Sequence, residues 1–150
     1  MKEEDVRTGW GKFGKDGMLG FPAWSPFPDG NDPILVGGKQ PAKGISFLPF
    51  PSSDGKVTYR LGGVHKLFTG SVALADLPPE AGGARPESPV WFTVWADGRL
   101  FWKSRPMQKP GESEPFRIQV ISVHRLELRV ISPGSGKHAR TVWIDPAVHR

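Results

Sequence analysis

The stretch that decides the fold is residues 90–107, VWFTVWADGRLFWKSRPM. Over residues 90–96 the side chains alternate between two faces, which is the period-two pattern of a β-strand. Asp97-Gly98 follows and predicts a two-residue type I′ turn, because both central positions of that turn need a positive φ. The return strand begins at Leu100. Because both faces of this hairpin carry large apolar groups, we expect it at the centre of the fold, packed on both sides.

Outward from this hairpin, short apolar runs alternate with Gly- and Pro-rich segments. Apolar alternation over residues 116–120 and 126–130 predicts a second hairpin that closes at Val123-His124. Further short strands are expected at residues 34–36, 44–50, 57–61, 65–74 and 141–144. No segment has a convincing helical period. Eight or nine short strands with turn signals between them predict an all-β fold, a two-sheet antiparallel β-sandwich or jelly roll.

The length of 150 residues fits a single domain with a proper core. Residues 1–9 are polar and predict a flexible tail, which leaves residues 10–150 as the sandwich domain. Residues 21–33 hold four prolines in thirteen positions, so they cannot form a helix or a central strand. We expect an ordered surface loop there, with Trp24 either docked onto the sandwich or held out as a binding platform.

Composition removes several classes of protein. The chain has no Cys, so a disulfide, a thiolate metal site and a cysteine nucleophile are all excluded. Its 20 Lys and Arg residues give a net charge of +5 but are spread with no run of three, which disfavours nucleic-acid binding. No apolar run approaches the ~20 residues of a membrane span. The charged start of the chain lacks an apolar signal core, so we expect either a cytoplasmic protein or a segment of a longer secreted chain.

No catalytic constellation is visible in the sequence. The four His residues do not cluster, and neither an HExxH nor a Gly-x-Ser-x-Gly motif occurs. Glu112 and Glu114 lie two residues apart in a loop, whereas a glycosidase needs two carboxylates held across a cleft. We therefore expect a protein that is not an enzyme.

A binding site is better supported, by residues 137–145, KHARTVWID. Aromatic rings match the apolar face of a sugar ring, and polar groups satisfy its hydroxyls, which are costly to bury unpaired. Lys137, His138 and Arg140 are expected to be exposed on a glycine-rich loop. Trp143 is either a core residue on the last strand or a ligand contact. Asp145 either caps a turn or contacts the ligand.

Residues 90–107 also resemble a family signature, apolar-Phe-x-Val-x-x-Asp-Gly-Arg-x-x-x-x-Ser. Further segments occur in the order that the same family has them. They are Trp10-Gly11, Gly37-Gly38-Lys39, Lys43-Gly44-Ile45, residues 68–76, residues 126–130, and His138-Ala139 with Trp143-Ile144-Asp145-Pro146. The chain is thus similar to the NPCBM family of carbohydrate-binding modules, close to carbohydrate-binding module family 51 and to the galactose-binding-like sandwiches. The likeness runs from about residue 10 to the end.

This resemblance implies a non-catalytic, lectin-like carbohydrate-binding module from a larger secreted, glycan-active protein. Its partner would be a glycan, with galactose-containing glycans among the candidates, bound by loops at one end of the sandwich. The implied location is extracellular or periplasmic, with the cytoplasm left open. The candidate ligand-binding residues are Trp24, Asp76, Lys137, His138, Arg140, Trp143 and Asp145. Relatives often hold a structural Ca²⁺, but the oxygen-bearing residues here are too scattered to predict one (Asp29, Asn31, Asp32 and Asp76). No other cofactor is expected.

Three departures from the family pattern leave alternatives open. Leu48 stands where the family has a histidine, and Ala75 stands where it has an aspartate. The closing segment also has extra residues between Ala139 and Trp143. If those polar groups form the family's pocket, this member has lost sugar binding or recognises another ligand. The alternatives are a protein-interaction or scaffold β-sandwich, and a basic domain that binds an anionic polymer, either nucleic acid or a sulfated glycan.

Overall fold

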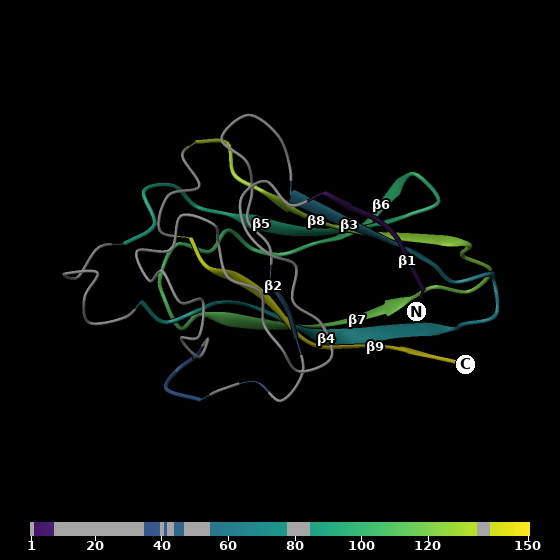
Figure 1. The fold of residues 1–150 in the computed structure, drawn as a ribbon, viewed down its shortest axis with the longest axis horizontal. Helices are drawn as coiled ribbons and strands as arrows, with labels where there is room; N and C mark the ends of the chain where they lie inside the picture. Colours follow the sequence, from purple (N-terminus) through teal and green to yellow (C-terminus); the bar gives the residue numbers. More distant parts are fainter. Residues whose placement is uncertain are drawn as a thin grey trace.

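The computed structural model describes residues 2–7, 35–39, 41, 44–46, 55–77, 85–134 and 139–150. These residues form nine β-strands: β1 (Lys2–Arg7), β2 (Gly44–Ser46), β3 (Gly55–Arg60), β4 (Leu67–Leu74), β5 (Trp91–Ala96), β6 (Arg99–Lys103), β7 (Ser113–Gln119), β8 (Arg125–Ile131) and β9 (Thr141–His149). A five-stranded sheet, β1-β3-β8-β5-β6, packs on a four-stranded sheet, β2-β9-β4-β7 (Figure 1). The described strand pairs are antiparallel, which confirms the predicted β-sandwich. Within the same ranges, no helix has the length and apolarity of a membrane crossing.

The core lies between the two sheets and is centred on aromatic residues from both. Trp143 of β9 is fully buried and meets the ring of Phe92 of β5 edge-on, with ring centroids 5.3 Å apart. Phe116 of β7 lies 5.8 Å from Trp143 and 4.9 Å from Phe68 of β4. Such tilted aromatic contacts add to the free energy gained by burying the rings. The core therefore joins β5 to the opposite sheet through Trp143.

The hairpin of β5 and β6 turns where the sequence predicts. Asp97 and Gly98 have φ values of 47° and 81°, as a type I′ turn requires. The Asp97 carboxylate also accepts backbone hydrogen bonds from His124 and Arg125, which ties the turn to the start of β8.

The position predicted for this hairpin is wrong. The central strand of the five-stranded sheet is β8, while β6 lies at the edge and is mostly exposed, with Leu100 48% and Phe101 45% accessible. The inward side chains of β5 are buried, and so is Thr93 on its outer face. Trp91 and Trp95 lie on that outer face, half-buried, with Lys103 and Arg129 over their rings.

The second predicted hairpin is also wrong, because β7 and β8 belong to different sheets. The side chains that alternation assigned to the interior are buried as expected, including Phe116, Ile118 and Leu128. The chain crosses from one sheet to the other over residues 120–124, with Ser122 at a φ of 60°. Alternation shows which face of a strand is buried, but strands that face each other across a core bury the same faces as strands that lie side by side.

Three segment boundaries also differ from the prediction. Residues 2–7, expected in the tail, form β1, whose backbone pairs along β3. The strand expected at residues 34–36 is instead a bridge between Val36 and Lys39 around a two-glycine turn. The last strand continues past residue 144 to His149, because a bulge at Asp145, with a φ of 48°, takes up Pro146 without ending the pairing with β4.

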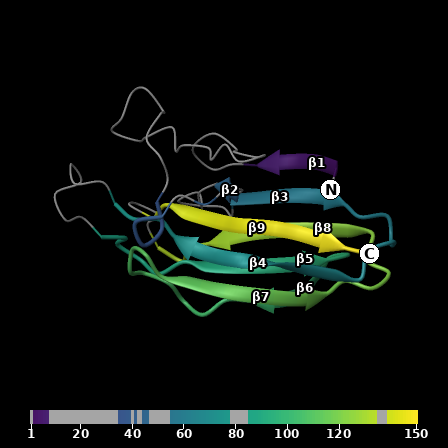
Figure 2. The same ribbon diagram turned by 90° about the horizontal axis from the view of Figure 1, so that it is seen from below.

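The two ends of the sandwich differ in content. The N and C termini lie at one end, and the turn at residues 35–39 lies at the opposite end (Figures 1 and 2). The second end also receives the segments that follow β4 and β6 and precede β5, β7 and β9. We call it the loop end.

Candidate functional site

The loop end is assembled where β4 ends and β9 begins. The Ala75 N–H, directly after β4, donates to the Arg140 carbonyl oxygen at 2.7 Å. The Leu74 N–H donates to the Glu112 carbonyl at 3.0 Å, and the Gly111 N–H donates to the Leu74 carbonyl at 2.9 Å. The end of one strand therefore binds both the loop between β6 and β7 and the segment that leads into β9.

Asp76 holds the two-glycine turn against this junction. Its carboxylate oxygens accept the N–H groups of Gly37 at 3.0 Å and Gly38 at 2.7 Å, and its own N–H donates to the Leu35 carbonyl at 2.7 Å. Gly37 and Gly38 have φ values of 58° and 80°, a backbone region that favours glycine. Arg140 lies beneath and directs one guanidinium N–H to the Asp76 carbonyl at 3.5 Å.

The loop between β6 and β7 is held in a similar way by two carboxylates. Glu112 accepts the N–H groups of Lys109 at 2.9 Å and Gln108 at 3.1 Å, and Glu114 accepts the Arg105 N–H at 3.0 Å. The Lys109 N–H lowers the pKa of Glu112, partial burial opposes this, and the Gln108 N–H with the charges of Arg105 and Lys109 lowers it further. These carboxylates order the loop through backbone groups and form no acid–base pair with one another in the described contacts.

The structure brings together two of the predicted site residues, Asp76 and Arg140. Arg140 is only 9% exposed, so it supports the loops from below instead of standing out on a loop as expected. Asp145 is exposed in the β9 bulge, five residues further along and about 16 Å away in an extended chain. Trp24, Lys137 and His138 lie outside the described residues.

Trp143 lies in the core, and this corrects its prediction as a ligand-binding residue. Its side chain is 0% exposed and lies against Phe92 and Phe116, so it has no surface for a ligand in this structure. The alternative considered from the sequence, a core residue on the last strand, is the one that the structure has.

Three glycines belong to this site although the sequence analysis did not include them. Gly37 and Gly38 supply the N–H groups bound by Asp76, and a Cβ on Gly111 would lie 3.3 Å from an Asp76 carboxylate oxygen. The signal in the sequence was the pair of glycines between Val36 and Lys39, which is typical of a tight turn. The distant partner of that turn, Asp76, is not visible from spacing.

The family departure at Ala75 has a structural counterpart. Ala75 is 2% exposed and belongs to a small apolar cluster with Ala73 and Val142, against which Val36 and Ile144 pack. A buried methyl group therefore occupies the position at which the resemblance predicts a carboxylate. Leu48, another departure, lies outside the described residues.

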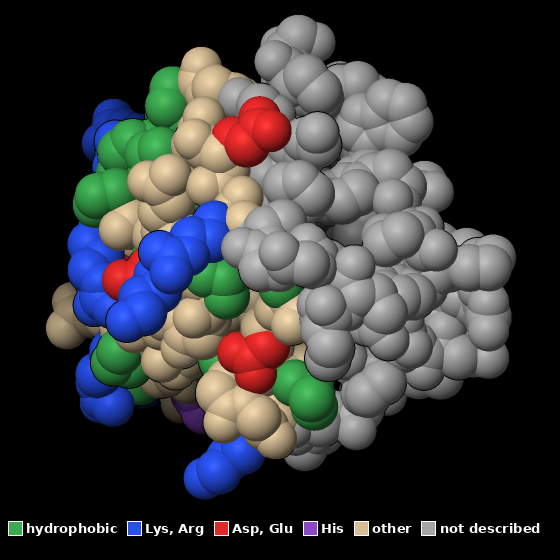
Figure 3. Space-filling view, turned by 90° about the vertical axis from the view of Figure 1, so that its left-hand side faces the viewer, with side chains coloured by type: hydrophobic (Ala, Val, Ile, Leu, Met, Phe, Trp, Pro, Cys, Tyr) green, Lys and Arg blue, Asp and Glu red, His purple; other side chains and the backbone are tan. Residues whose placement is uncertain are grey.

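Figure 3 shows the loop end face-on. In its described part, Lys and Arg side chains gather in several places, with Asp and Glu side chains set singly among them. Within the described ranges, no three His, Cys, Asp or Glu residues are grouped closely enough to hold a metal ion. Both oxygens of Asp76 already face amide donors, and the other oxygen-bearing candidates for Ca²⁺ lie outside those ranges.

Comparison with known protein families finds one matching family model. The family model described as NPCBM/NEW2 domain matches residues 1–149. No curated protein matches the sequence.

Solved structures share the fold over nearly the whole chain. A CBM51 module from Clostridium perfringens GH95, in complex with methyl-galactose, has a TM-score of 0.72 and 19% identity, covering 99% of this chain and 94% of that one. A structure of the M60 catalytic domain with CBM51-1 and CBM51-2 domains from Clostridium perfringens ZmpB has a TM-score of 0.73 and 21% identity, with 99% and 14% coverage. The structure of CBM51-2 in complex with GlcNAc and INT domains of the same protein has a TM-score of 0.72 and 18% identity. The match covers 99% of this chain and 30% of that one.

The coverage values also bear on domain organisation. This chain spans 14% and 30% of the two ZmpB chains, so the matching unit is one module of a longer polypeptide in those structures. At identities near 20% the likeness is one of fold.

Proposed function

The chain belongs to the NPCBM/NEW2 domain family, and from this we propose that it is a non-catalytic carbohydrate-binding module. The observation that carries the proposal is the family match over residues 1–149, together with a sandwich whose loops converge at one end. Sugar sites need fixed polar groups, because a hydroxyl that loses water must find a partner.

We propose the loop end as the binding surface. The carboxylates of Asp76, Glu112 and Glu114 each accept hydrogen bonds from backbone N–H groups of the loops. In this proposal they stabilise the loops and do not act as a catalytic acid and base. Rigid loops reduce the entropy that is lost when a ligand binds. Asp76 and Arg140 act in this proposal by positioning the loops, while Lys137, His138 and Trp24 are the candidates for direct contact with the sugar.

The ligand that we propose is a neutral glycan containing galactose. The support is the CBM51 module in complex with methyl-galactose, which this chain matches over 99% of its length. A related module was solved with GlcNAc, so N-acetylglucosamine is the comparison sugar. Because Ala75 replaces a carboxylate of the family pattern and is buried, we expect contacts that differ in detail from those of relatives.

Titration calorimetry with methyl-galactose and N-acetylglucosamine, preceded by a neutral glycan array, tests this function. We expect saturable binding of one of them that is lost in His138→Ala with no change in melting temperature. His124→Ala is the matched control, since His124 is exposed beside the turn at Asp97, at the end of the sandwich opposite the loop end. Absence of binding on the array and in both titrations would contradict the proposal and favour a protein-interaction module.

We further propose that the domain works within a larger, secreted, glycan-active protein and tethers it to its substrate. The support is that matching modules occupy a minor part of chains such as ZmpB, which includes an M60 catalytic domain. Sequencing the flanking coding region tests this: a signal peptide and a catalytic domain in the same reading frame are expected, and a reading frame without either would contradict it.

A further inference from the structure

The outer face of the five-stranded sheet carries cationic residues in a line across the strands. Strand register pairs Lys56 of β3 with Arg129 of β8, Arg129 with Thr93 of β5, and Thr93 with Lys103 of β6. Residues paired in this way share one face of a sheet, and neighbouring strands lie about 4.8 Å apart. Lys56, Arg129 and Lys103, which we call the basic row, therefore span about 14 Å.

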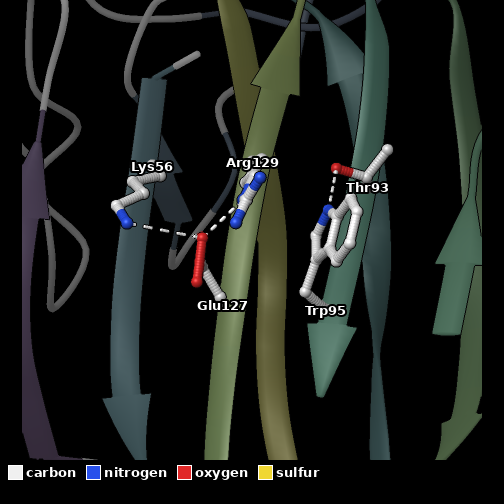
Figure 4. A network of polar contacts seen from close by, with 5 residues as sticks. All are labelled: Lys56, Thr93, Trp95, Glu127 and Arg129. Carbon is white, nitrogen blue, oxygen red and sulfur yellow. Dashed lines mark hydrogen bonds and ion pairs between the residues drawn. The ribbon is translucent and has the colours of Figure 1, made fainter. Parts of the chain in front are cut away.

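Two tryptophans on β5 hold cations of the row in place. The Arg129 guanidinium lies 4.4 Å from the centroid of the Trp95 ring, and the Trp95 indole N–H donates to the Thr93 hydroxyl at 3.0 Å (Figure 4). The Lys103 ammonium lies 5.1 Å from the centroid of the Trp91 ring. Since Trp91 and Trp95 flank Thr93 along the strand, the two rings support the row from opposite sides. This arrangement limits the motion of the charged groups and orients them before any ligand arrives.

The charge of this face is uneven. Strands β3, β5, β6 and β8 hold one acid, Glu127, and six basic residues: Lys56, Arg60, Arg99, Lys103, Arg125 and Arg129. The sequence of β1, at the edge of the same sheet, adds two basic residues, Lys2 and Arg7, and three acids, Glu3, Glu4 and Asp5. Glu127 bonds to Arg129 and lies 3.6 Å from Lys56 (Figure 4). Lys56 and Arg129 stand directly opposite each other on β3 and β8. The single negative charge of Glu127 thus offsets one of these two positive charges. Like charges in that relation lower the stability of a sheet, and the contacts of the row with Glu127, Trp91 and Trp95 offset this in part.

We propose that the basic row binds an acidic polysaccharide that lies across the strands, with its sulfate or carboxylate groups paired to Lys56, Arg129 and Lys103. Guanidinium and ammonium groups form their strongest hydrogen bonds with such anions. Single-stranded nucleic acid binds through open aromatic faces on which its bases stack. Trp91 and Trp95 each have a cation over one face of the ring, while Phe101 of β6 is 45% exposed. The choice of a polysaccharide among polyanions rests on the proposed function. The row itself is a second surface, on the strands instead of the loop end.

Affinity electrophoresis and calorimetry of the intact chain with dextran sulfate, polygalacturonate and uncharged dextran test the row. We expect binding to at least one charged polymer, none to dextran, and affinity that falls steeply as salt rises, because bound counterions are released. Lys56→Gln and Lys103→Gln should each weaken binding about three- to tenfold at low salt and lower the salt slope by about one. A preference for dextran sulfate assigns sulfate as the partner, and a preference for polygalacturonate assigns carboxylate.

Arg117→Gln is the matched control, since Arg117 is exposed on β7 of the other sheet. An equal loss in this variant, or no binding to either polyanion at low salt, would overturn the proposal. Oligothymidylate that binds as tightly and with the same variant pattern would overturn the choice of polysaccharide. Titration of the same variants with methyl-galactose separates the two proposals: row-dependent polyanion binding without galactose binding refutes only the loop-end function.

Discussion

Trp143 contacts Phe92 and Phe116 at the centre of the core and has no exposed surface. We expect Trp143→Ala to lower the free energy of unfolding by roughly 3–5 kcal/mol, because the large side chain leaves a cavity that the sheets cannot close. Trp143→Phe should cost less, since it keeps an aromatic ring in the same place. Urea unfolding measures both, and an unchanged midpoint accompanied by lost glycan binding would contradict the core role.

Asp76 acts at the same scale, through two backbone hydrogen bonds to Gly37 and Gly38. Asp76→Ala leaves both N–H groups without their acceptor, so we expect a loss of about 1–2 kcal/mol in unfolding free energy and weaker galactoside binding. Asp76→Asn keeps one acceptor oxygen and should fall between Ala and the native residue. Equal stability of all three proteins in urea would show that the turn does not depend on this carboxylate.

Glu112 predicts a pH effect on stability. Its pKa lies below the ordinary value of 4.5, chiefly because the carboxylate accepts the Lys109 N–H. A group whose pKa is lowered in the folded state stabilises the protein above its unfolded pKa, and this contribution is lost as the pH falls through the folded pKa. The difference in unfolding free energy between the native protein and Glu112→Gln should therefore shrink below about pH 4.5. A difference that is constant with pH would contradict this assignment.

At the scale of elements, the hairpin of β5 and β6 depends on a carboxylate as well as on its turn residues. Asp97 adopts a positive φ and accepts the N–H groups of His124 and Arg125. We expect Asp97→Ala to lower unfolding free energy by about 1–2 kcal/mol, from lost hydrogen bonds and an unfavourable φ. Asp97→Asn, which tolerates the same φ and keeps an acceptor, should lose less than half as much. Identical urea midpoints for Ala and Asn would mean that the bonds to β8 contribute little.

Element pairing shows where sequence patterns stop being informative. Alternation in β7 and β8 identified their buried faces, and the two strands nevertheless lie in opposite sheets. The position of the β5–β6 hairpin differs from the prediction for a related reason. The large rings of Trp91 and Trp95 predict a covering layer of protein, whereas the cations of Lys103 and Arg129 lie over them at the surface. Large apolar groups therefore predict cover, but not whether the cover comes from the core or from a neighbouring charged side chain.

At the scale of the whole molecule, the loop end and the basic row are separate surfaces with different electrostatic requirements. We expect methyl-galactose affinity to change less than about twofold between 50 and 200 mM salt, because a neutral sugar displaces no counterions. Calorimetry at both salt concentrations measures this. A steep fall in galactoside affinity as salt rises would indicate that charged groups contribute most of the binding free energy. That result would favour an anionic ligand at the loop end.

The order of residues along the chain was sufficient for several features that depend on near neighbours. It determined the strand-rich fold, the inward faces of the long strands and the type I′ turn at Asp97-Gly98, because alternation and turn geometry act over a few residues. Only the tertiary structure decided which strands share a sheet, that Asp76 holds the turn at Gly37 and Gly38, and that Lys56, Arg129 and Lys103 form one row. These relations join residues far apart in the sequence, and their partners follow from how the two sheets close over a shared core, which no local pattern specifies.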